Sequence, residues 1–142
     1  MTDTPKHSVS VAGVVVDDQG HVLVIKRRDN GRWEPPGGVL ELDETLEAGV
    51  RREILEETGV EVVVGAMTGA YKNMERGIVA LVFRCRPTGG RAHTSDEAET
   101  VKWLTPQEAL SVMDEAYGVR VLDALSDVAR HRTHDGVRLL RS

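Results

Sequence analysis

Runs of β-branched and aliphatic residues alternate with polar segments along the chain, a pattern that predicts a mixture of strands and helices. Two runs within residues 8–28 are separated by Asp17-Asp18-Gln19-Gly20, a segment typical of a hairpin turn. Glycine, proline and polar residues predict loops at 29–38 and 88–99. Further strands are predicted at three places: residues 60–71, 77–87 and 100–104.

Helical patterns occupy three segments. The first begins near Asp43 and is predicted to stop at Gly59, because glycine is favoured just after a helix. The second opens at Thr105, an N-cap residue followed by proline. The third is predicted over 115–132, and the tail from Thr133 is unassigned. Strands interleaved with helices indicate an α/β sandwich with a mixed sheet.

Composition narrows the class of protein. A chain of 142 residues with 40% hydrophobic and 29% charged residues predicts one soluble domain spanning 1–142. Its single cysteine excludes an internal disulfide and favours a reducing, cytoplasmic location. The net charge of −5 argues against a nucleic-acid polymer as partner. The sequence also lacks a long apolar run, so we expect no membrane span. We expect a monomer or a homodimer.

The acidic charge is concentrated in one stretch, residues 37–60. Seven acids and two bases give this stretch a charge of −5, equal to that of the whole chain. Glu53, Glu56 and Glu57 are three and four residues apart and so project from one helix face. Their mutual repulsion would become coordination around a hard divalent cation such as Mg²⁺. A solvated acidic face is the alternative interpretation.

The spacing of fixed residues in this stretch resembles the Nudix box. That motif reads G-x5-E-x7-R-E-U-x-E-E-x-G-U, where U is aliphatic, and every defining position matches. A Trp shortly before Pro-Gly-Gly also resembles the family's lead-in to the box. The resemblance implies the Nudix α/β/α sandwich over nearly the whole chain. The matching residues are Gly38, Glu44, Arg52, Glu53, Ile54, Glu56, Glu57, Gly59 and Val60.

The resemblance also implies roles for residues of the box. The three helix glutamates would bind Mg²⁺ or Mn²⁺, with the carbonyl of Gly37 as a further ligand, and one glutamate would act as general base. Arg52 and Glu44 would pair and brace the loop against the helix. The implied reaction is attack by a metal-activated water on a nucleoside diphosphate linked to another group.

Residues outside the box are expected to complete the site. A late loop often adds a carboxylate in this family, and Glu97 is favoured over Glu99 here. Trp33 is a candidate to stack on a base, with core packing as the alternative. Basic residues outside the box are candidates to bind substrate phosphates. The first candidates lie near the second strand, and two later arginines come after them: Arg27, Arg28 and Arg32, then Arg76 and Arg84.

The substrate is left open by these motifs. A (deoxy)nucleoside triphosphate is the leading small-nucleotide substrate. The proline typical of ADP-ribose hydrolases is missing from "KNMERG", and Tyr71 lies too early for the tyrosine of dinucleoside-polyphosphate hydrolases. A hydrolase of ADP-ribose or another nucleotide sugar is an alternative. So is a non-catalytic nucleotide-binding sensor, although a sensor has no chemical need for the intact carboxylate set.

Overall fold

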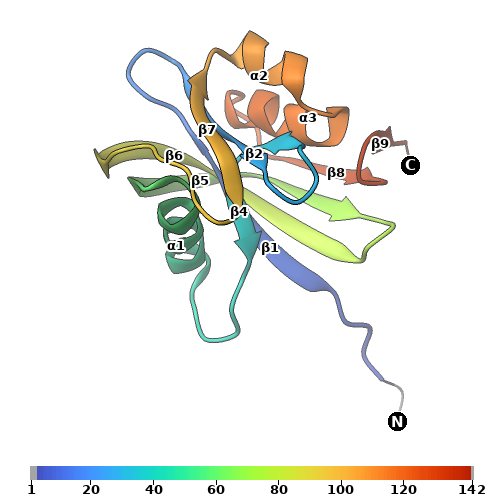
Figure 1. Ribbon diagram of the computed structural model, residues 1–142. Helices are drawn as coiled ribbons and strands as arrows, with labels where there is room; N and C mark the ends of the chain where they lie inside the picture. The colour runs from blue at the N-terminus through green and yellow to red at the C-terminus, as the bar shows by residue number, and fades with distance from the viewer. Residues whose placement is uncertain (1–2, 142) are drawn as a thin grey trace.

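The computed structural model describes residues 3–141, and within them groups of strands are separated by helices along the chain (Figure 1). The elements, in chain order, are β1 (Ser8–Val15), β2 (Val22–Arg27), β3 (Trp33–Glu34), β4 (Gly37–Val39), α1 (Leu46–Thr58), β5 (Val60–Asn73), β6 (Ile78–Gly90), β7 (Ala98–Leu104), α2 (Pro106–Val112), α3 (Glu115–Ala124), β8 (Arg130–His134) and β9 (Leu139–Leu140).

The strands form two sheets. The larger has the order β4-β1-β6-β5-β8-β9, and the smaller has the order β3-β2-β7. The larger sheet is mixed. Strand β1 runs parallel to β6, and β5 runs parallel to β8. The pairs β1–β4, β5–β6 and β8–β9 are antiparallel. This pairing confirms the predicted mixed central sheet.

Helices cover the sheets from opposite sides (Figure 1). Because successive strand residues face opposite sides of a sheet, β1 contributes to two cores. Val11 and Val15 join Ile54 of α1 in one buried cluster. Val14 joins Val121 of α3 in the other. The α/β/α sandwich expected from the resemblance is therefore confirmed.

The predicted turn between the first two strands is present at residues 17–20, where the Gly20 N–H donates to the Asp17 carbonyl at 3.1 Å, but the two strands do not continue as a paired hairpin. Strands β1 and β2 share only the isolated bridge between Val16 and Val22 and belong to different sheets. The hydrogen-bonding edges of β1 are instead taken by β4 and β6. A local turn signal does not reveal that these more distant strands occupy both edges.

The C-terminal prediction also needs correction. The third helix ends at Ala124, and residues within the rest of the predicted span form β8, which pairs in parallel with β5. The unassigned tail continues β8 and adds β9. No helix among residues 3–141 has both the length and the apolar character that crossing a membrane requires.

Candidate active site

Helix α1 is fixed at both ends by its own sequence. The Thr45 hydroxyl accepts a hydrogen bond from the Ala48 N–H at 3.1 Å, which caps the start of the helix. Gly59 ends the helix with a φ of 79°, a left-handed conformation that glycine adopts without strain. The helix therefore stops at the predicted residue, and its start lies three residues beyond Asp43.

Three carboxylates meet beside this helix. Glu53 and Glu57 of α1 and Glu97 of the loop before β7 each place an oxygen within 4.8 Å of the other two. Glu53 and Glu57 are only 8% and 4% exposed, while Glu97 is exposed. Buried carboxylates at this separation repel one another unless a proton or a cation lies between them. The donor set of clustered oxygens suits a hard divalent cation.

The pKa values of the two buried carboxylates are both raised in this environment. Burial raises the pKa of Glu57 to about 9, and the negative charges of Glu53 and Glu97 act in the same direction. Burial also raises the pKa of Glu53, although the hydrogen bond from Arg52 opposes the shift. A bound divalent cation would remove the cost of ionising both groups.

Strand β4 shapes the cluster through its two glycines. The Gly37 N–H donates to Glu57 Oε1 at 2.7 Å and so fixes that carboxylate. A Cβ at Gly38 would lie 2.6 Å from the Glu53 carboxyl group, so only glycine leaves room for it here. Whether the Gly37 carbonyl is also a metal ligand stays a prediction.

Arg52 ties the carboxylates of the acidic stretch together. It forms a bidentate pair with Glu44 at 2.9 and 2.6 Å. Its Nη1 also donates to Glu53 at 3.0 Å and to Glu56 at 3.2 Å, and its Nη2 donates to the Val39 carbonyl at 3.2 Å. The hydrogen bonds from Arg52 lower the pKa of Glu44 to about 2. The expected brace between loop and helix is thus present.

Glu56 differs from its two helix neighbours. Its side chain is 60% exposed, and its carboxylate pairs with Arg52 outside the cluster of three. The structure therefore brings Glu53 and Glu57 together with Glu97, and it leaves Glu56 at the rim. A metal-binding role for Glu56 stays a prediction.

The loop that carries Glu97 is held by Arg28. The guanidinium of Arg28 donates to the carbonyls of Ser95 and Asp96 at 3.0 and 3.2 Å, and its backbone N–H donates to the Glu97 carbonyl at 2.9 Å. Glu99 instead pairs with Lys26 at 3.2 Å. Of the two carboxylates considered from sequence, Glu97 is the one that reaches the cluster.

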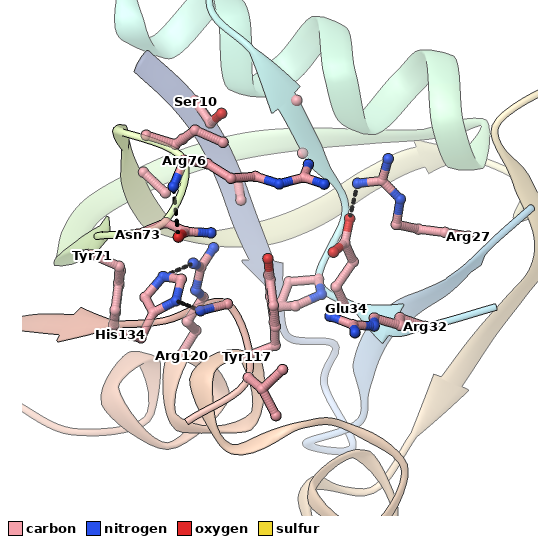
Figure 2. Close-up of a pocket in the computed structure, with 18 of the residues that line it drawn as sticks. Ser10, Arg27, Arg32, Glu34, Tyr71, Asn73, Arg76, Tyr117, Arg120 and His134 are labelled. Atoms are coloured by element: carbon pink, nitrogen blue, oxygen red, sulfur yellow. Dashed lines mark hydrogen bonds and ion pairs between the residues drawn. The ribbon is translucent and has the colours of Figure 1, made fainter. Parts of the chain in front are cut away.

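A cavity of about 520 Å³ opens beside the cluster (Figure 2). Gly37 and Gly38 of β4 line this cavity and also contact the cluster carboxylates. Its walls come from β1, β4, β5, α3, the loop before β3 and the segment after β8. This volume falls within the usual range for small-molecule sites. The carboxylate cluster therefore adjoins a space large enough for a nucleotide-sized group.

Comparison with known proteins identifies the family. The family model described as the NUDIX domain matches residues 6–125. The chain is 59% identical over 140 residues to a "MutT-like protein" of Streptomyces ambofaciens, covering 98% of this chain and 91% of that one. The chain belongs to the Nudix family. It is a MutT-like Nudix hydrolase that acts on phosphoanhydride bonds.

More distant relatives share the fold under different names. An "ADP-ribose pyrophosphatase" of Methanocaldococcus jannaschii is 34% identical over 104 residues, or 68% of this chain and 61% of that one. The crystal structure of a NUDIX hydrolase from Nitrosomonas europaea superimposes with a TM-score of 0.78 at 20% identity, covering 93% of this chain and 80% of that one. Nudix hydrolases act on small nucleotides and generally use a divalent metal, but these names do not agree on one substrate.

The basic residues proposed from sequence occupy different places around the Nudix site. Arg27 and Arg32 line the cavity, and their binding to substrate stays a prediction. Arg27 pairs with Asp29 at 2.8 Å and with Glu34 at 3.3 Å. Trp33 is not among the lining residues; it packs against the core beside α2 and α3, with the Lys102 ammonium 5.9 Å from its ring. Its position supports the alternative interpretation, core packing.

Several lining residues were missed by the sequence analysis. They come from β5, α3 and β8: Tyr71, Asn73, Tyr117, Arg120 and His134 (Figure 2). The one available signal was the i, i+3 spacing of Tyr117 and Arg120, which places both on one helix face. His134 lay in the unassigned tail, so its approach to α3 was not predictable from local pattern.

Proposed function

We propose that this protein is a metal-dependent pyrophosphohydrolase whose substrate is a (deoxy)nucleoside triphosphate. Mg²⁺ or Mn²⁺ would be held by Glu53, Glu57 and Glu97. The observation that carries the proposal is this carboxylate cluster at the edge of a cavity of about 520 Å³. A bound divalent ion would neutralise the phosphate charge and lower the pKa of the attacking water.

The chain's own residues would position this chemistry. Arg52 holds Glu53 through a 3.0 Å hydrogen bond, and the Gly37 N–H holds Glu57. Arg28 holds the loop that carries Glu97. The carboxylates of Glu53 and Glu57 are thus fixed by separate donors, and Glu97 is positioned through the backbone of its loop, which would lower the cost of reorganisation when substrate binds. One glutamate of the site would accept the proton of the attacking water.

A triphosphate is favoured over ADP-ribose by two observations. The relative that matches over nearly the whole chain is named MutT-like. The segment "KNMERG" lacks the proline that marks ADP-ribose hydrolases. ADP-ribose and other nucleotide sugars are the second candidates, because a more distant relative bears that name.

The test is a panel of nucleoside triphosphates, ADP-ribose and UDP-sugars, each incubated with Mg²⁺ or Mn²⁺. We expect a triphosphate to give the highest kcat/KM, and Glu57→Gln to lower kcat for that substrate by at least 100-fold. Preferential consumption of ADP-ribose would replace the substrate assignment. Binding of nucleotides without turnover of any compound would support a sensor.

A further inference from the structure

Arg120 is a buried cation that lacks a carboxylate partner. It comes from the middle of α3, lines the cavity and is only 6% exposed. Its Nε donates to the Ala116 carbonyl at 3.3 Å, and its Nη2 lies 3.3 Å from His134 Nε2. No carboxylate among residues 3–141 lies within ion-pair distance of it. The charge of Glu34 acts on Arg120 only from beyond that distance, and a buried charge without a direct ion pair is unfavourable, so its retention calls for an explanation.

Two tyrosine rings hold the guanidinium in place. Its central carbon lies 4.5 Å from the ring centre of Tyr117 and 4.9 Å from that of Tyr71. Such contacts stabilise a cation and restrict how the planar group turns. The Tyr71 hydroxyl is itself fixed by a 2.8 Å hydrogen bond to Asp123. Arg120 is thus rigidly oriented.

The third guanidinium nitrogen, Nη1, remains available to a ligand. Among residues 3–141, Nη1 donates to no acceptor. Every fully buried side-chain nitrogen or oxygen in the same residues has a hydrogen-bond partner, so Nη1 cannot be fully buried. Nη1 is therefore reachable from the cavity, toward which Arg120 points in Figure 2. A guanidinium donates hydrogen bonds and accepts none, so this wall selects an acceptor.

The charge of the cavity favours a neutral acceptor over a second anion. Four arginines among the lining residues are matched by four acids. Glu34, whose pKa is raised by burial, faces the same space; it forms an ion pair with Arg27, and the charge of Arg120 acts on it from a greater distance. A surplus of positive charge, which an additional phosphate would need, is missing. The balanced lining residues are Arg27, Arg32, Arg76 and Arg120, against Asp29, Glu34, Glu75 and Asp135.

We propose that Arg120 determines base specificity by donating a hydrogen bond to a keto oxygen of the nucleobase. This inference rests on the proposed function, because it assigns the cavity to the nucleoside part of the substrate. Hypoxanthine, guanine and uracil present such an oxygen. Adenine and cytosine present an amino group at the same position. An amino group is itself a hydrogen-bond donor, so it would face the Nη1 donor and leave Nη1 without an acceptor. A mismatch of this kind lowers affinity by about 10-fold to 100-fold.

The direct test is calorimetric binding of nucleoside monophosphates to the metal-free protein in EDTA. Two pairs differ at one keto or amino position: IMP against AMP, and UMP against CMP. We expect the keto member of at least one pair to bind at least tenfold more tightly. Equal affinities, tighter binding of the amino members, or no binding by either pair would each overturn the proposal. Because no turnover is measured, failure of hydrolysis is a separate result.

Variants connect the preference to Arg120 itself. Arg120→Gln should bring the keto-to-amino affinity ratio close to one, since an amide can donate or accept. Arg130→Gln is the matched control, because Arg130 is exposed on β8 and does not line the cavity; it should keep the wild-type ratio. Should Arg120→Gln not fold, the wild-type comparison still decides.

A phosphate probe separates the two sources of acceptor oxygens. Ribose 5-phosphate should bind wild-type protein at least tenfold more weakly than IMP, and Arg120→Gln should change its affinity little. If ribose 5-phosphate binds as tightly as IMP and loses that affinity in Arg120→Gln, Arg120 holds a phosphate and the proposal is wrong.

Discussion

Replacing Glu57 with glutamine should stabilise the metal-free protein while abolishing most of its activity. Glu57 is 4% exposed, and burial raises its pKa from 4.5 to about 9. In the absence of metal, folding at neutral pH must therefore protonate this carboxyl group or bury its charge. Glutamine removes that cost, and its side-chain oxygen still accepts the Gly37 N–H.

The size of the effect follows from the pKa difference. The folded chain holds a proton on Glu57 that the unfolded chain releases near pH 4.5, so the contribution of Glu57 to the stability of the wild type is most favourable below pH 4.5 and declines as the pH rises toward 9. The loss is about 1.4 kcal/mol per pH unit. Glu57→Gln should thus be more stable than wild type by about 3 kcal/mol at pH 7, but by less than about 1 kcal/mol at pH 5.

Urea unfolding in EDTA at pH 5 and pH 7 measures this difference. Glu56→Gln is the control, because Glu56 is 60% exposed and lies outside the cluster; its stability should stay within about 0.5 kcal/mol of wild type at both pH values. Saturating Mg²⁺ should stabilise the wild type and not Glu57→Gln. A gain that is absent, or that is equal at the two pH values, would refute the reasoning.

Three further predictions concern other parts of the site. Arg52→Ala should lower the melting temperature by several degrees and kcat by at least tenfold, because Arg52 holds both Glu44 and a cluster carboxylate; unchanged melting with lost activity would indicate a direct catalytic role. Glu97→Gln should weaken Mn²⁺ binding at least tenfold, whereas Glu99→Gln should leave it near wild type; titration of both variants decides, and the reverse order would exclude the assignment. Burial and the charge of a neighbouring arginine lower the pKa of His134 to about 4, so wild-type stability should fall as the pH drops from 6.5 toward 4. Acid unfolding of His134→Asn should show a loss smaller by up to about 3 kcal/mol, and an unchanged acid profile would contradict this.

The parts of the site that depend on local sequence were predictable. The end of α1 at Gly59 was predicted from that glycine, whereas the helix starts three residues beyond the predicted Asp43, and the 53/57 spacing sets two carboxylates on one face. The brace between Arg52 and Glu44 followed from the family resemblance and is present as a bidentate pair. These features are encoded within about one or two turns of helix.

The remaining parts depend on contacts between distant segments. The edges of β1 are taken by strands far along the chain, which a turn signal at 17–20 does not indicate. Glu97 reaches the cluster because Arg28, about 70 residues earlier, holds its loop. Arg120 becomes a cavity residue only because β8 brings His134 beside it. The residues next to each of these segments do not indicate which distant segment will pair with it.

Phosphorus NMR of the preferred triphosphate incubated with wild-type protein and Mg²⁺ tests the central claim most directly. We expect nucleoside monophosphate and pyrophosphate in equal amounts, with the reaction stopped by EDTA and restored by added Mg²⁺. Turnover that continues in excess EDTA, or no cleavage of any triphosphate, would contradict it.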